Sequence, residues 1–180
     1  MAHDLVELDL DYTYDHKFHA PLDAVFDAYI SCKPPIGVLK KLVVVSKGRP
    51  WGQKETPLSP ELFQEGTKLK ATYGFLFGLI KREMLFDITS IKRRDDHAAV
   101  IMGVPDQPYA GYEKFGTCCE GETIVTIEQH TNTQCLMRSS VLLHLKDFPA
   151  YCIDGFSQES EKYAEKQFRI FVGKLEKMLR

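Results

Sequence analysis

The stretch from Val6 to Phe26, VELDLDYTYDHKFHAPLDAVF, decides the fold. Up to Phe18, apolar and aromatic residues alternate with polar ones, a period of two that is typical of a strand with one wet face. From Pro21 to Ile30 the apolar residues recur at helical spacing, and proline is tolerated in the first turn of a helix. We therefore predict a long strand that leads directly into a helix, which must end before Pro34.

The middle of the chain predicts a meander of antiparallel strands. Residues 36–45 predict a second short helix, although the three valines at 43–45 favour a strand locally. Residues 46–66 are rich in glycine and proline and predict an irregular connection with one turn at 60–64. Short breaks between the later segments can join only antiparallel neighbours. These later strands are predicted at 67–75, 81–93, 97–104, 112–119, 122–131 and 134–146.

The last part of the chain predicts one long amphipathic helix. Ser157 resembles an N-cap, and apolar residues then recur at three- and four-residue steps as far as Leu179. The order of elements predicts an α+β fold in a single domain over residues 1–180. A curved antiparallel sheet of about seven strands would wrap around the C-terminal helix, with one or two short helices after the first strand.

The segment from Tyr14 to Phe26, YDHKFHAPLDAVF, and this order of elements resemble the START-like, or SRPBCC, superfamily. That superfamily includes birch-pollen-allergen-like proteins, lipid-transfer domains and aromatic polyketide cyclases. The resemblance implies a helix-grip fold with a ligand cavity. The function we expect is binding of a lipid, a sterol or a polycyclic aromatic or polyketide molecule. One alternative is a cofactor-independent cyclase or dehydratase acting in the same cavity, and another is an interaction module with a filled core.

The cavity is expected between the sheet and the last helix, with a volume of roughly 300–1,000 Å³. The segment from Tyr73 to Ile80 is apolar and flanked by glycine, so it is either a rim that contacts ligand or transiently contacts a membrane, or a buried strand and turn. The predicted ligand-binding residues are Tyr12, Tyr73, Phe75, Phe86, Tyr109, Tyr112, Met137, Phe168, Phe171 and Val172.

His16 is the candidate for chemistry. Strict alternation places it on the same face of the first strand as Tyr12 and Tyr14. A buried imidazole beside phenols can act as a general base or orient a ligand carbonyl, so an enzyme would use His16 with Tyr14 as catalytic residues. The alternative is a core histidine that is hydrogen-bonded to a phenol or a main-chain carbonyl.

The register of the hairpin around Asn132 decides which polar side chains enter the cavity, because a slip of one residue exchanges the two faces. In one register Glu128 faces Arg138 on the outside. In the other, Glu128 and His130 line the cavity with Met137 and Ser139. We prefer the first because its inner face is continuously apolar. That face would consist of Val125, Ile127, Met137, Val141, Leu143 and Leu145.

Composition and motifs exclude several other classes. A net charge of −2 and a pI of about 6.3 provide no overall positive electrostatic potential that would attract the phosphates of nucleic acid. The six histidines lack metal-ligand spacing, and no cofactor motif is found, so we expect neither metal nor cofactor. Five cysteines without a repeated spacing predict reduced thiols. Without a signal-peptide pattern or an apolar run long enough to span a membrane, we expect a cytoplasmic protein.

Overall fold

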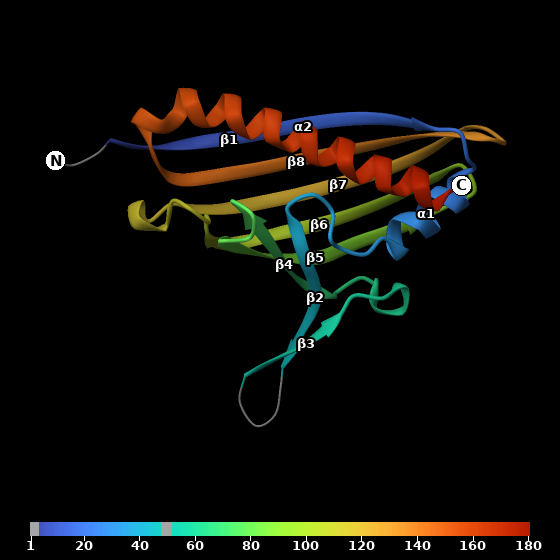
Figure 1. Ribbon diagram of the computed structural model, residues 1–180, viewed down its shortest axis with the longest axis horizontal. Helices are drawn as coiled ribbons and strands as arrows, with labels where there is room; N and C mark the ends of the chain where they lie inside the picture. The colour runs from blue at the N-terminus through green and yellow to red at the C-terminus, as the bar shows by residue number, and fades with distance from the viewer. Residues whose placement is uncertain (1–3, 48–51) are drawn as a thin grey trace.

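The computed structural model describes residues 4–47 and 52–180. Within these ranges, eight strands form one antiparallel sheet in the order β1-β8-β7-β6-β5-β4-β2-β3 (Figure 1). The strands are β1 (Leu5–Phe18), β2 (Leu39–Lys47), β3 (Gln53–Pro57), β4 (Lys68–Phe75), β5 (Ile80–Arg93), β6 (His97–Pro108), β7 (Cys118–Thr131) and β8 (Gln134–Pro149). The α-helices are α1 (Leu22–Ser31) and α2 (Ile153–Met178), and the 3-10 turns are η1 (Pro60–Leu62), η2 (Glu113–Phe115) and η3 (Ala150–Cys152).

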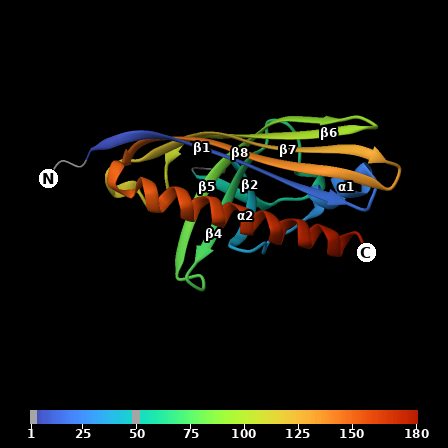
Figure 2. The ribbon, with the colours of Figure 1, turned by 90° about the horizontal axis from the view of Figure 1, so that it is seen from above.

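Helix α2 lies across one face of the sheet, and β2 and β3 are strongly tilted relative to β1 and β8 (Figures 1 and 2). The predicted α+β helix-grip architecture is confirmed, with eight strands in place of about seven. None of the helices in the described ranges is both long enough and apolar enough to cross a membrane.

The prediction of a second helix at 36–45 is wrong, because this segment forms a bridge between Ile36 and Leu39 and then strand β2. Strand β2 is paired on both sides, with Val43 opposite Lys70 of β4 and opposite Pro57 of β3. Pairing on both edges and the preference of valine for extended backbone outweigh the weak helical spacing.

The predicted connection over 46–66 contains a strand that the sequence pattern does not reveal. Strand β3 reads QKETP and has no apolar alternation, because it is an edge strand whose side chains are largely exposed. The turn predicted at 60–64 is confirmed as η1. Residues 48–51 of this connection lie outside the described residues.

Two predicted strand breaks are wrong. Strand β6 continues through 105–108 because its pairing with β7 shifts between Val104 and Gln107. On the other side of β6, the Gln107 side chain binds the backbone of β5 in place of a main-chain pair. Its Oε1 accepts a hydrogen bond from Leu85 N at 2.9 Å, and its Nε2 donates one to Leu85 O at 3.0 Å. Strand β7 continues through Gly121, which takes a φ of 154°, whereas residues 113–115 of the predicted strand at 112–119 form η2.

Helix α2 begins at Ile153, four residues before the predicted N-cap at Ser157. The chain enters it directly from β8 through the turn η3, with Pro149 at the start of that turn. No side chain caps the helix; Asp154 lies in its first turn, where a carboxylate favours the positive end of the helix dipole. The predicted N-cap at Ser157 is therefore wrong, because the chain is already helical when it leaves the 3-10 turn η3.

The hairpin between β7 and β8 has the faces that we preferred. Ile127 and Met137 lie opposite one another and are fully buried. Glu128 and His130 are exposed on the outer face. Arg138 lies directly opposite Thr126, so it is a diagonal neighbour of Glu128 and not its direct partner. The assignment of faces is confirmed. The direct pairing of Glu128 with Arg138 is wrong, because Glu128 lies opposite Leu136.

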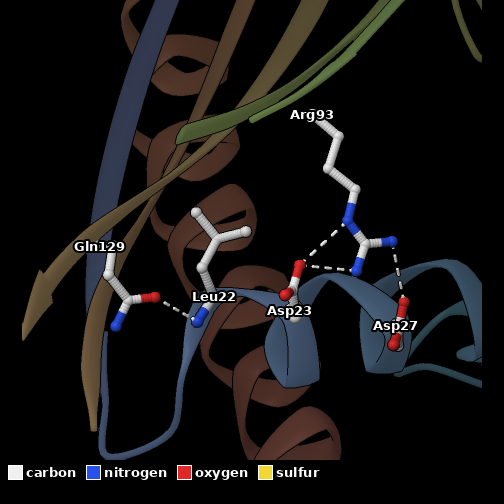
Figure 3. A network of polar contacts seen from close by, with 5 residues as sticks. All are labelled: Leu22, Asp23, Asp27, Arg93 and Gln129. Carbon is white, nitrogen blue, oxygen red and sulfur yellow. Dashed lines mark hydrogen bonds and ion pairs between the residues drawn. The ribbon is translucent and has the colours of Figure 1, made fainter. Parts of the chain in front are cut away.

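Helix α1 is fixed to the sheet by polar contacts at its first turns (Figure 3). Gln129 Oε1 of β7 accepts a hydrogen bond from Leu22 N at 2.6 Å, which satisfies a free amide at the helix start. Arg93 of β5 binds Asp23 at 2.7 Å and Asp27 at 3.1 Å (Figure 3). The sequence thus anchors α1 with side chains from two strands that are distant in the chain.

The core consists of two clusters between the sheet and the helices. One gathers α1, the α2 residues Phe168, Val172 and Leu175, and the inner side chains of the central strands. The other is built around Leu145 and Phe148 of β8. Residues from both clusters also border an unfilled space beneath α2.

Candidate functional site

A cavity of about 520 Å³ lies between α2 and the inner face of the sheet. Its volume is within the range that we predicted and within the usual range of small-ligand sites. The walls are mainly apolar, with contributions from β1, β4 to β8, α1, β2 and α2. On α2 the lining residues are Ser160, Tyr163, Ala164, Gln167, Phe168 and Phe171.

Most of the predicted ligand-binding residues border this cavity. The following predicted residues line it: Tyr12, Tyr14, Tyr73, Phe75, Phe86, Tyr109, Phe168 and Phe171. Met137 and Val172 are instead buried within the core, and Tyr112 packs on Phe148 at 4.9 Å and Phe156 at 5.5 Å. These three residues are not among those that line the cavity. Contact of the others with a ligand stays a prediction.

His16 is on the predicted face of β1 but lies outside the cavity lining. Its Nε2 is 2.9 Å from Oε1 of Glu176 in the last turns of α2, and its ring packs edge-on against Phe18 at 4.6 Å. The partner is thus a carboxylate, and neither a phenol nor a main-chain carbonyl. Tyr14 does line the cavity, and its hydroxyl donates to the Glu161 carbonyl at 3.1 Å. The geometry separates the two residues that we predicted to act together.

Several phenols meet inside the cavity. The Tyr12 hydroxyl is 2.5 Å from Ser160 Oγ of α2, which ties β1 to the helix. Burial, together with the nearby groups of Cys119, Tyr112, Tyr12 and Tyr163, raises the pKa of the Tyr109 phenol. Burial also raises the pKa of Tyr163 to about 12. Phenols with raised pKa values remain protonated at neutral pH, so they can donate hydrogen bonds to a ligand oxygen.

The ionisation of these phenols gives a testable pH dependence. Burial raises the pKa of Tyr29, Tyr73 and Tyr109 above the value of about 10 that an unfolded phenol has. The unfolded state therefore loses these protons first, and the free energy of unfolding should fall as the pH rises above about 10. In an ultraviolet absorbance titration we expect these phenols to ionise together with loss of the circular dichroism signal. Ionisation of all eight tyrosines near pH 10 in a still-folded protein would contradict this.

The mouth of the cavity lies at the base of the β4–β5 hairpin. The lining residues that are exposed to solvent are Glu83 of β5, Pro108 at the end of β6 and Tyr163 of α2. Phe75 of β4 packs on Tyr163 with tilted rings whose centroids are 5.8 Å apart. Hairpin and helix therefore meet at this opening through an aromatic contact.

Our sequence-based prediction missed the polar side of α2. Ser160 and Gln167 line the cavity, and Gln167 Oε1 also accepts a hydrogen bond from Val38 N at 3.1 Å. Tyr163 also lines the cavity and was not among the predicted ligand-binding residues. The spacing 160, 163, 164, 167, 168 and 171 keeps one helix face together, and this spacing is the signal that could have identified them. In the described residues, no group of three or more His, Cys, Asp or Glu side chains is arranged to hold a metal ion.

No family sequence model matches the chain, and no curated protein matches it either. Its structure is similar to that of norcoclaurine synthase from Thalictrum flavum in complex with dopamine and hydroxybenzaldehyde. The TM-score is 0.56 at 13% identity, over 96% of this chain and 87% of the synthase chain. It is also similar to human STARD10, with a TM-score of 0.57 at 10% identity, over 92% of this chain and 62% of that one.

The chain shares the helix-grip fold of these two proteins. A conserved protein from Geobacillus kaustophilus shares this helix-grip fold, with a TM-score of 0.57 at 13% identity over 94% of this chain and 95% of that one. At such identities the similarity establishes the fold. The cavity of this helix-grip chain must therefore be interpreted from its own side chains.

Proposed function

We propose that the chain binds a hydrophobic small molecule in the cavity beneath α2. The observation that carries this proposal is the combination of a volume of about 520 Å³, a predominantly apolar wall and several protonated phenols. Ligand sites typically have this composition, in which apolar walls provide affinity and a few polar groups fix orientation. A filled core, as in a pure interaction module, does not fit this volume.

The phenols narrow the chemistry of the ligand. Tyr109 and Tyr163 can donate hydrogen bonds, so a ligand with an acceptor oxygen on an apolar or aromatic body complements the cavity. Lipids, sterols and polycyclic aromatic or polyketide molecules have this character. The synthase of similar fold holds dopamine and hydroxybenzaldehyde, which are small aromatic molecules with oxygen substituents.

Binding is favoured over a cyclase or dehydratase reaction by the position of the titratable groups. A proton-transfer residue must come within hydrogen-bond reach of the substrate. His16 is held by Glu176 outside the lining, and the carboxylate of Glu83 lines only the exposed mouth of the cavity. The buried phenols are poor bases because they stay protonated at neutral pH. The arrangement therefore supports recognition of a ligand oxygen better than transfer of a proton.

The experiment that tests the proposal combines native mass spectrometry with a matched pair of variants. We expect protein purified from its own host to release a bound apolar molecule, and we expect purified protein to bind a fluorescent naphthalene sulfonate probe. Ala164→Trp places a large side chain inside the cavity, which takes up volume that the probe needs and should weaken probe binding by about tenfold or more.

Lys166→Trp is the control, because Lys166 is exposed on the opposite face of the same helix. It introduces the same side chain without entering the cavity, so its probe affinity should equal that of the wild type. Equal affinity for the wild type and Ala164→Trp, with both proteins folded, would show that the probe and any natural ligand bind elsewhere.

A further inference from the structure

The turn between β4 and β5 exposes an unusual amount of apolar surface. We define the β4–β5 tip as residues 76–79, with the sequence LFGL. Phe77 is fully exposed, and Leu79 and Leu76 are 85% and 64% exposed. Three of the four most exposed large apolar residues in the described ranges therefore lie in one turn. Clustered exposure of this kind marks an interaction site far more often than scattered single residues do.

The backbone of the tip is strained in a way that the fold does not require. Leu76 and Phe77 have φ values of 48° and 57°, in the left-handed region that bulky residues rarely adopt. The turn is closed by a hydrogen bond from Gly78 N to Phe75 O at 3.0 Å. Asn and Gly suit such positions without strain. A strained turn that presents leucine and phenylalanine to solvent indicates a functional reason for those side chains.

Positive charge lies directly behind the apolar tip. From Gly74 to Arg82 the hairpin carries Lys81 and Arg82 and has no acidic residue. Lys40 of β2 runs alongside, because a Cβ at Gly74 would lie 3.1 Å from Lys40 Cγ. This segment therefore has a local positive charge, although the whole chain has a net charge of −2. Apolar residues in front of cations match the layers of an anionic membrane, whose acyl region lies beneath negatively charged headgroups.

The shape of the hairpin favours a bilayer over a protein partner. It projects past α2 and away from the rest of the sheet (Figure 2). A stable protein interface needs about 800 Å² per partner, contributed by roughly 20–30 residues. A narrow convex tip of four residues is too small for that, whereas it suits shallow insertion between lipid headgroups.

We propose that the β4–β5 tip docks the protein onto anionic lipid membranes by inserting Leu76, Phe77 and Leu79. Docking there brings the cavity mouth to the membrane surface, because Phe75 and Arg82 of the same hairpin line the cavity. A hydrophobic ligand could then pass between the bilayer and the cavity without crossing water. This passage rests on the proposed function, whereas the docking itself does not.

The test is co-sedimentation with phosphatidylcholine vesicles that contain or lack phosphatidylserine. The key variant is Leu76→Asn with Phe77→Gly, because Asn-Gly is the favoured sequence of such a turn and should preserve or increase the melting temperature. We expect the wild type to bind the vesicles that contain phosphatidylserine, with weaker binding at high salt and to phosphatidylcholine alone. The variant should bind about tenfold or more weakly.

Leu5→Asn is the matched control, since Leu5 is 45% exposed and lies at the start of β1, outside the hairpin. Its vesicle binding should equal that of the wild type. Failure of the wild type to bind either vesicle, or equal binding by the double variant, would overturn the proposal. So would self-association that the double variant abolishes in the absence of vesicle binding, because a second copy would then be the partner.

The naphthalene sulfonate measurement separates this inference from the proposed function. The double variant leaves the cavity lining intact, so its probe affinity in solution should equal that of the wild type. Loss of vesicle binding with full probe affinity supports docking by the tip. Vesicle binding by a wild-type protein that takes up no probe would support docking and argue against the cavity as the ligand site.

Discussion

Replacing Leu175 by alanine is expected to lower the free energy of unfolding by about 2–5 kcal/mol, a large share of the 5–15 kcal/mol that is typical of a domain. Leu175 is completely buried and completes the α2 ridge that includes Phe168 and Val172. Truncation removes its apolar contacts and leaves a cavity in the packed cluster next to α1. For a chain of this length the melting temperature should fall by roughly 4–20 °C, measured by calorimetry or circular dichroism.

Ile170→Ala is the control on the same helix. Ile170 is 38% exposed, and alanine is the better helix former, so its free energy of unfolding should change by no more than about 0.5 kcal/mol. Equal losses for the two variants would mean that the buried side chain of Leu175 contributes no more to stability than the partly exposed side chain of Ile170. That result would contradict the packing described here.

Gly121→Ala should destabilise the protein by more than about 2 kcal/mol because the added carbon has no space. Gly121 lies in β7 with a φ of 154°, and a Cβ there would be 2.0 Å from the Leu142 carbonyl oxygen and 3.0 Å from Leu143 Cα. Both obstacles are backbone atoms of β8, which cannot turn aside as a side chain can. We expect a lower melting temperature and weaker probe binding, since Cys119 and Thr123 on either side line the cavity.

Gly173→Ala is the same chemical change, but it should stabilise the protein instead of destabilising it. Gly173 lies inside α2, and a Cβ there would have no atom within 4 Å. Replacing an interior helical glycine by alanine typically stabilises a protein by about 0.5–1 kcal/mol. Chemical denaturation of both variants would test the pair, and a stable Gly121→Ala protein would show that β7 and β8 are not fixed at this distance.

The elements with strong local periodicity could be predicted from the sequence, and those that depend on pairing could not. Strand β1 and helix α1 follow from residues 6–30 because alternation and helical spacing are encoded there without ambiguity. Strand β3 has no apolar pattern, since its stability comes from pairing with β2. The continuation of β6 depends on the Gln107 side chain binding the backbone of Leu85, a contact that composition does not reveal.

The candidate site shows the same division. The alternation in β1 and the helical spacing in α2 placed Tyr12, Tyr14 and Phe168 on elements that face one another, and all three line the cavity. The same alternation placed His16 on the inner face of β1, but it gave no information about the residue with which His16 forms a hydrogen bond. Glu176 lies 160 residues away along the chain and reaches His16 only because α2 runs the full length of β1 (Figures 1 and 2). The sequence therefore predicted which face of β1 His16 occupies, but not which residue of α2 it contacts.

The pairing of β1 with β8 has a consequence for biosynthesis. Leu10 lies opposite Leu143, so β1 finds its hydrogen-bonding neighbour only among residues that are translated long after it. Topologies dominated by such distant pairs have high contact order and fold slowly, because the entropy of closing the long loop must be overcome first. While the ribosome is still translating the intervening strands, the apolar side of β1 has no partner and is available to chaperones. Co-translational folding of this sheet should therefore be completed only once β8 has emerged from the exit tunnel.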